Sequence, residues 1–347
     1  YTGEIHFIQQ NFSAALEAYQ QAIEIDPDFA PAYLGRAQAN RAIESAAGSH
    51  RANRPDDIQE TLQVFLKDIQ QAVDLDPAYF PARLELAAGY IRLGEVELAL
   101  EQLEAVEEIL PASAQSLALR AQIEILQDQS AAALQSAQEA LKKDKGYLPA
   151  YRILGRAALL NQKPGLAVEH LKTYLDYEQK DAEAWLWYGQ ALYGSSRYSQ
   201  SVSALDTALG LDTELVEAYT TRGMVYIELE EGQKAVNDFL VVFHEQPKSF
   251  NSSLNLGRGL LAAGRFVAAR DQLSASQRLA QADEELAQVF YHRALANEAL
   301  EDHFSALKDW QALVDLPEQA ANEMWLQAAR SALRPTATPS KTPAPTK

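Results

Sequence analysis

Nine glycine or alanine residues recur along this chain at a nearly constant interval, and this interval constrains the fold more than any other feature. Most lie 34 residues apart, one interval is 50 residues, and the last is 37. The nine are Gly3, Ala37, Ala87, Ala121, Gly155, Gly189, Gly223, Gly257 and Ala294. A period of this length indicates a stack of similar units, each of which buries its apolar face against the next.

Two further sets of positions keep the same period. Twelve residues after the small residue comes a second small site in every repeat except the second, which carries extra residues and has Phe65 there: Ala15, Phe65, Ala99, Ala133, Ala167, Ser201, Ala235, Ala269 and Ala306. Four residues later comes a mostly larger set: Tyr19, Ile69, Leu103, Ala137, Leu171, Leu205, Phe239, Leu273 and Trp310. Small residues let two helices cross closely, and the larger residue fills the space beside the crossing. Each unit is therefore predicted to be a pair of packed helices.

Composition supports an all-helical chain. Ala, Leu, Gln and Glu, which are good helix formers, dominate, and only 16 Gly and 14 Pro occur in 347 residues. Runs of β-branched residues are scarce. The chain also exceeds the length at which one compact core usually stops growing, so several domains or a linear array are expected. No apolar run is long enough to cross a membrane, and no signal peptide is recognisable.

The order of small, small, larger and then Pro on a 34-residue period resembles the tetratricopeptide repeat. The prolines are Pro27, Pro77, Pro111, Pro247 and Pro317, whereas other units have Lys145, Gln179, Thr213 and Gln281 at this place. The resemblance covers residues 1–317 and implies an all-α, right-handed superhelical α-solenoid of about nine helix pairs. The expected repeats are 1–29, 30–79 with an insertion at 43–58, 80–113, 114–147, 148–181, 182–215, 216–249, 250–283 and 284–317.

Three segments depart from the repeat. The insertion Ile43–Asp57 is either a longer first helix that ends near Gly48 or a loop, with Arg54 and Pro55 at the start of the second helix. Residues 318–334 predict a capping helix with one apolar face: Met324, Trp325, Ala328, Ala329 and Leu333. Residues 335–347 are mostly Pro and Thr and are expected to be disordered.

We find no pattern that predicts chemistry. The chain has no Cys, and its six His residues are spread over at least five repeats without a metal-ligand spacing. Gly257-Arg258-Gly259 lies within a predicted helix, with no preceding strand to suggest a dinucleotide site. The formal net charge of −18 disfavours nucleic acid and anionic lipid as partners. We therefore expect no enzymatic activity, no cofactor and no metal, and a protein or peptide as the partner.

The resemblance also implies a binding surface, because in the family the first helix of each pair lines a concave groove. Carried over by repeat position, the candidate groove residues are Leu84, Ala88, Ile91, Arg92, Gln122, Ile125, Arg152, Arg156, Leu186, Gln190, Tyr193, Met224 and Arg258. Arg152 and Arg156 either pair with acids of neighbouring repeats or grip carboxylates of a peptide. Leu84, Ile91, Ile125 and Leu186 are expected to serve as its apolar anchors.

The Lys and Asn clamp of the chaperone-binding family members is not found. Its positions carry Leu34 and Gln38, Leu84 and Ala88, and Ala118 and Gln122. The function expected is therefore a non-catalytic binding scaffold or adaptor other than a heat-shock co-chaperone. A regulatory or substrate-recruiting arm of a larger enzyme and a self-assembling scaffold remain alternatives, and the oligomeric state is open. The Thr/Pro tail favours a bacterial envelope or extracytoplasmic location, with the cytoplasm as the alternative.

Overall fold

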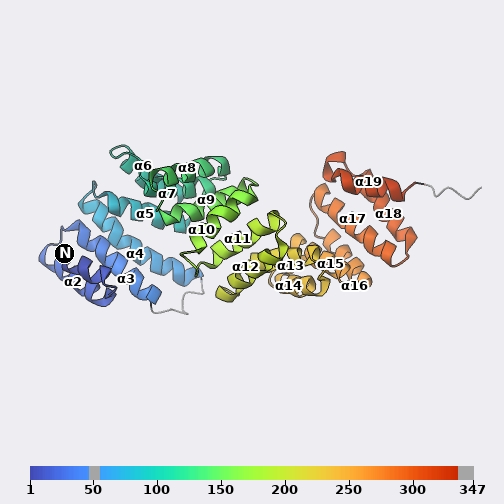
Figure 1. Cartoon of the computed structure of the whole chain (residues 1–347), viewed down its shortest axis with the longest axis horizontal. Helices are drawn as coiled ribbons and strands as arrows, with labels where there is room; N and C mark the ends of the chain where they lie inside the picture. The colour runs from blue at the N-terminus through green and yellow to red at the C-terminus, as the bar shows by residue number, and fades with distance from the viewer. Residues whose placement is uncertain (47–54, 335–347) are drawn as a thin grey trace, which may run out of the picture. The chain divides into compact units, whose positions relative to one another are not determined.

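A computed structural model describes residues 1–46 and 55–334, and in these ranges it contains helices and no strands. By its internal contacts the chain divides into two compact units, Tyr1–Tyr177 (unit 1) and Glu178–Lys347 (unit 2). In Figure 1 the helices follow one another as antiparallel pairs along the chain. We call the first helix of each pair the A helix and the second the B helix.

The bounds of the helices show the regularity of the pairs. Unit 1 contains α1 (Thr2–Ile8), α2 (Phe12–Ile25), α3 (Ala30–Ala46), α4 (Pro55–Leu75), α5 (Phe80–Leu93), α6 (Val96–Glu107), α7 (Ala114–Leu126), α8 (Ser130–Lys143), α9 (Leu148–Leu160) and α10 (Pro164–Leu175). Unit 2 contains α11 (Ala182–Gly194), α12 (Tyr198–Leu211), α13 (Val216–Glu228), α14 (Gly232–Glu245), α15 (Phe250–Ala262), α16 (Phe266–Gln277), α17 (Asp283–Ala299), α18 (His303–Asp315), the 3-10 helix η1 (Glu318–Ala320) and α19 (Glu323–Ala332).

The small residues lie where the A and B helices of a pair cross. A Cβ atom added to Gly189 would lie 2.6 Å from Cγ of Leu205, and one added to Gly223 would lie 2.6 Å from Cε1 of Phe239. Leu205 and Phe239 are fully buried. In both pairs the larger residue comes 16 positions after the glycine, as the sequence pattern predicts. The space beside each glycine of the A helix is therefore filled by a large side chain from the B helix.

A left-handed residue ends the A helix at eight places in the described ranges: Gln10, Gly94, Asp128, Gln162, Ser196, Glu230, Gly264 and Glu301. The next backbone N–H then bonds back to the A helix, as when Glu231 donates to the carbonyl of Tyr226 at 2.8 Å. This arrangement is a Schellman-type cap, which satisfies carbonyl groups at a helix end. Only two of the eight residues are glycine, although the left-handed region strains other residues.

Asp residues close several B helices, with or without a proline. Oδ1 of Asp26 and Asp76, which precede prolines, accepts a hydrogen bond from the backbone N–H two residues later. Asp144 and Asp212 accept the same bond at 2.8 Å in units that lack the proline. Because Asp favours this local turn over a continuing helix, the turns predicted only from the repeat register form without proline.

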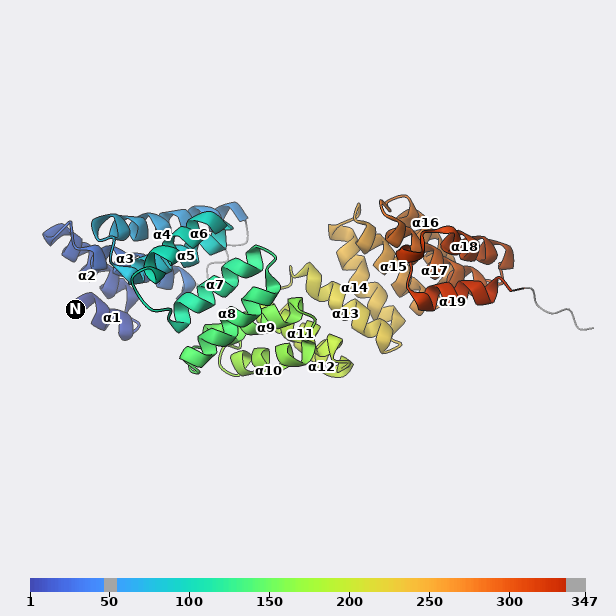
Figure 2. The same ribbon diagram turned by 90° about the horizontal axis from the view of Figure 1, so that it is seen from above.

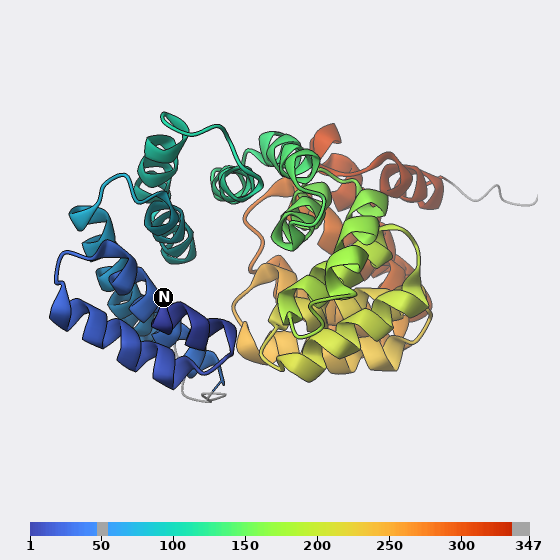
Figure 3. The same cartoon turned by 60° about the vertical axis from the view of Figure 1, so that its left-hand side comes forward.

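The insertion in the second repeat lengthens its first helix. α3 extends to Ala46, and α4 begins at Pro55, within the segment predicted to start the second helix. Residues 47–54 lie outside the described residues, and so does the 335–347 tail that was predicted to be disordered. Figure 3 shows the blue N-terminal helices packed side by side, in line with contacts from α1 to α2, α2 to α3 and α3 to α4.

The last helix, α19, packs against α18 (Figure 2). Its buried residues are Leu326 and Ala329, and Trp325 stacks on Tyr291 with ring centroids 4.9 Å apart. The predicted apolar face was wrong in one residue, because Met324 is 70% exposed. At 100° per residue, Met324 lies on the opposite side of the helix from Leu326 and Ala329.

Candidate functional site

The A helices form the inner face of each unit. Besides the contacts between chain neighbours, α5 contacts α7 and α7 contacts α9 in unit 1, and in unit 2 α11 contacts α13, α13 contacts α15 and α15 contacts α17. Within the described ranges no B helix approaches the next B helix as closely. Each unit therefore curves with its A helices on the inside, which is the side where a repeat array presents an extended concave surface.

On unit 1, two guanidinium groups gather near one carboxylate on this face. Arg41 of α3 lies 3.6 Å from Glu85 of α5, measured from Nη1 to Oε2. Partial burial lowers the pKa of Arg92, and the positive charge of Arg41 lowers it further, while Glu85 acts in the opposite direction. Arg92 nonetheless has an exposed side chain. Solvent thus reaches Arg92, while neighbouring residues displace part of the water around its guanidinium.

The other predicted groove residues of unit 1 differ in exposure. Ala88, Ile91, Gln122 and Ile125 are partly exposed. Leu84 was expected to be an apolar anchor on the surface, but it is only 9% exposed and packs in the core with Leu119 and Ile123 of α7. The expectation failed because the neighbouring A helix α7 packs against α5 and covers this position.

Arg152 and Arg156 of α9 are partly exposed, and both take part in interactions of the chain. Neither guanidinium is therefore unoccupied. Leu126 and Leu160, at the C-terminal ends of α7 and α9, are 45% and 41% exposed. Apolar side chains accordingly accompany the charges of the unit 1 face.

On unit 2, a hydrogen bond links two neighbouring A helices. Nε2 of Gln190 on α11 donates to Oε1 of Glu217 on α13 at 2.7 Å. Tyr193 and Met224 are partly exposed on the same helices. Leu186 was also expected to be an apolar anchor on the surface, and it is likewise buried. It is 3% exposed and belongs to a core cluster with Val225.

Arg258 of α15 is the last of the predicted groove residues. Its Nη1 lies 3.4 Å from Oδ1 of Asn255, and no carboxylate of the described residues lies within 4.0 Å of it. Burial lowers its pKa, and the nearby Tyr193 and Glu228 oppose that effect. His292 of α17 is close enough for the charge of Arg258 to act on it. Burial first, and Arg258 second, lower the pKa of His292 to about 3.

Models of two related families match parts of the chain. A model described as TPR repeat matches residues 3–42, and one described as Tetratricopeptide repeat matches residues 153–215. Together with the recurring A and B helices, these matches identify the repeat. Residues 3–42 and 153–215 carry tetratricopeptide repeats.

Several solved structures of repeat proteins align with this chain. The Cut9 and Hcn1 hetero-tetramer of the APC/C aligns with 96% of this chain and 75% of its own at 15% identity, with a TM-score of 0.58. A tetratricopeptide repeat protein from Parabacteroides merdae aligns with 73% of this chain and 98% of its own at 15% identity, with a TM-score of 0.50. MamA from Desulfovibrio magneticus aligns with 49% of this chain and 94% of its own at 21% identity, with a TM-score of 0.45. No curated protein matches the sequence at a significant level.

The tetratricopeptide-repeat fold is that of a protein-interaction scaffold. Among residues 1–46 and 55–334, no group of three or more His, Asp or Glu side chains is arranged to hold a metal ion. No helix in the same ranges is long and apolar enough to span a membrane.

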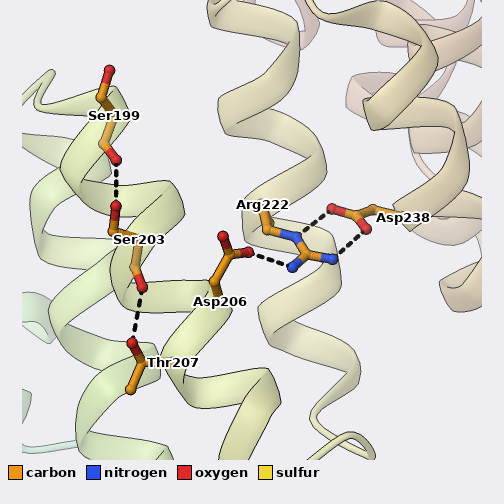
Figure 4. A network of polar contacts seen from close by, with 6 residues as sticks. All are labelled: Ser199, Ser203, Asp206, Thr207, Arg222 and Asp238. Carbon is orange, nitrogen blue, oxygen red and sulfur yellow. Dashed lines mark hydrogen bonds and ion pairs between the residues drawn. The ribbon is translucent and has the colours of Figure 1, made fainter.

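Sequence reasoning missed a set of ion pairs that joins the helices of this chain. Arg222 of α13 binds Asp238 of α14 through two hydrogen bonds and also reaches Asp206 of α12 at 2.6 Å (Figure 4). Hydrogen bonding to Asp238 is the main reason that the pKa of Arg222 is raised above its ordinary value. Equivalent pairs form between Arg36 and Asp68 and between Arg293 and Asp309.

A signal for these pairs was present in the sequence. In all three repeats the Arg directly precedes the small residue of the A helix. The Asp comes three residues after the second repeat site, which lies on the B helix and is occupied by Phe65, Ala235 and Ala306. Five repeats lack both members: the first carries Thr2 and Ala18, and the others carry Leu86 and Gln102, Leu154 and His170, Tyr188 and Ala204, and Leu256 and Gln272. One repeat has the Arg alone, with Arg120 at the first position and Ser136 at the second. Arg120 pairs instead with Glu107 of the preceding B helix. The Arg and Asp lie 16 residues apart in two of the three pairs and 32 apart in Arg36–Asp68, which spans the insertion, so only a search that follows the repeat register detects all three.

Proposed function

We propose that the chain is a non-catalytic scaffold that binds protein or peptide segments on the A-helix faces of its units, and that unit 1 binds a segment with acidic and apolar residues. The observation that carries the proposal is the arrangement of Arg41 and Arg92 around the single carboxylate of Glu85. Two like charges at partly desolvated positions repel each other, and a carboxylate supplied by a ligand offsets that repulsion. Arginine suits the role because its guanidinium binds carboxylates in a bidentate manner.

Apolar side chains on the same face support this assignment. Ile91 of α5 and Ile125 of α7 are partly exposed, and Leu126 follows Ile125 at 45% exposure. Contacts of this kind supply affinity, while the charged groups fix the orientation of the ligand. The net charge of −18 makes a cationic surface unusual for this chain, and this contrast favours a specific role for the two arginines.

The test uses the full chain and a fluorescein-labelled peptide of 11 residues with three Glu and three Leu. Arg92→Gln should weaken binding about tenfold, as expected for the loss of one charge-assisted contact of about 1.4 kcal/mol. It should also flatten the dependence of the dissociation constant on salt, because that dependence reflects the exposed charges that are screened.

The matched control is Lys142→Gln, which removes the same charge from the exposed side of α8 in unit 1. Lys142 lies on a B helix, so its loss should change the affinity and the salt dependence little. Equal effects of the two substitutions would indicate general attraction to a positive charge rather than binding at the A-helix face.

A further inference from the structure

We propose that unit 2 carries a second site of different specificity, which binds a peptide segment that combines one carboxylate, bound by Arg258, with basic residues that face Glu228 and Glu217. The inference rests on the proposed function, since it assigns a ligand class to the A-helix face of unit 2. It concerns a separate unit and a different pattern of charge from the acidic segment proposed for unit 1.

Arg258 is the first reason. It is only partly exposed, yet its one hydrogen-bond partner among the described residues is the neutral amide of Asn255 at 3.4 Å. Removing water from a guanidinium without supplying a carboxylate is unfavourable. A carboxylate from a ligand would restore this missing partner.

The neighbouring arginines of unit 2 show what the chain does where a guanidinium has only a structural role. Arg222 forms ion pairs with Asp238 and Asp206, and Arg293 forms one with Asp309 at 2.6 Å. Both lie on A helices, as Arg258 does. Among the described residues no such carboxylate pairs with Arg258, which contacts Asn255 instead.

The uncharged neighbours of Arg258 restrict the ligand further. The low pKa of His292 keeps its imidazole neutral at physiological pH, so it adds no second positive charge. Burial raises the pKa of Tyr193, so its phenol also stays neutral. Both groups remain available as hydrogen-bonding groups next to a single cation.

Two carboxylates lie on α13: Glu228 at its C-terminal end, close enough to act on Arg258, and Glu217 in its first turn. Glu228 is exposed and has no ion pair within the part of the chain that the structure describes, and Glu217 is exposed and bonded only to the neutral Gln190. A segment with several acidic residues would be repelled by Glu217 and Glu228, whereas a purely basic one would leave Arg258 without a partner. A mixed segment satisfies all three groups, and the partly exposed Met224, Ile227 and Leu261 offer apolar contacts.

The experiment compares two fluorescein-labelled peptides of 11 residues on the full chain by fluorescence anisotropy. Both contain the same three Leu; the mixed peptide has one central Glu between two Lys, and the acidic peptide has three Glu. Arg258→Gln should weaken binding of the mixed peptide at least tenfold and leave that of the acidic peptide unchanged. Arg92→Gln should do the reverse.

A second variant tests whether a loss of peptide binding in Arg258→Gln comes from a disturbed fold. Glu228→Gln keeps the size of an exposed side chain, and it should weaken the mixed peptide several-fold but not a version with Ala in place of both Lys. Unchanged binding of the mixed peptide to Arg258→Gln would overturn this inference, as would loss of both peptides in equal measure. Failure of the proposed function would appear separately, as an acidic peptide that is insensitive to Arg92→Gln.

Discussion

Arg222 and Asp238 are joined by two parallel hydrogen bonds, from Nε to Oδ2 at 2.8 Å and from Nη2 to Oδ1 at 2.7 Å. Their side chains are 17% and 7% exposed, and they connect the A and B helices of one repeat. Because Asp238→Asn would remove the buried partner of Arg222 and leave it with the 53% exposed Asp206, it should lower the free energy of unfolding of unit 2 by roughly 3 kcal/mol.

The measurement is chemical denaturation followed by tryptophan fluorescence, which reports on unit 2 because all four Trp residues lie in it. Asp271→Asn is the control, since Asp271 is 64% exposed and pairs with its neighbour Arg270. An exposed pair contributes about 0.5 kcal/mol or less, so this control should unfold nearly like the parent. Similar losses in both variants would contradict the structural role of Asp238.

Packing at the helix crossing gives a second prediction. Gly189→Leu places side-chain atoms where Leu205 already lies, so it should cost on the order of 1 to 3 kcal/mol through overpacking. Gly210→Ala is the control, because a Cβ atom there meets no other atom within 4 Å. Its replacement within a helix should be neutral or stabilising by up to about 1 kcal/mol. If Gly189→Leu unfolds like the parent, the repeat register is wrong.

The left-handed caps give a third prediction, in the opposite direction. Glu230 is exposed and has φ of 59°, so Glu230→Gly should relieve strain and stabilise unit 2 by about 1 kcal/mol. Gly264 occupies the same position one repeat later with φ of 70°, and Gly264→Ala should destabilise unit 2 by a similar amount. Denaturation by urea would measure both, and a loss of stability in Glu230→Gly would contradict the assignment.

Much of this fold could be predicted from the sequence, but some features could not. The crossing of Gly223 with Phe239 follows from residue size and spacing alone. The left-handed turn at Glu230 could not be predicted, because Glu gives no local signal for a positive φ and the register of the whole repeat imposes it. The boundary between the two units was also missed, since it falls within the regular 34-residue interval from Gly155 to Gly189.

The candidate site was predicted less well, for a related reason. Repeat position indicates which side of an A helix a residue occupies, but not how closely the next A helix covers it. Arg92 and Arg258 remained on the surface, whereas Leu84 and Leu186 became core residues beneath it. The depth of a side chain depends on residues 34 positions away, which a single repeat does not contain.

The buried imidazole of His292 predicts a dependence of stability on pH. Its pKa is about 3 in the folded chain and 6.5 as the ordinary value, so below pH 6.5 the unfolded chain binds the proton more readily. Stability of unit 2 should therefore be complete above pH 6.5 and fall by up to about 1.4 kcal/mol per pH unit as the pH decreases toward 3.

An asparagine at this position cannot be protonated, so His292→Asn should reduce that slope. The rings of Tyr291 and Trp325 and the charge of Arg258 surround the imidazole and are present in both proteins. The same tryptophan-monitored denaturation at pH 7.0, 6.0 and 5.0 measures the difference. A parallel decline in both proteins would show that His292 is not responsible.

The most direct test of the account is to locate a bound ligand by photo-crosslinking. Benzoylphenylalanine is placed at Ile125, on A helix α7, or at Leu98, a 41% exposed residue of B helix α6, and each protein is irradiated with the labelled acidic peptide. We expect position 125 to give an adduct that unlabelled peptide competes away, and position 98 to give none. Equal labelling at both positions, or labelling at position 98 alone, would contradict binding on the A-helix face.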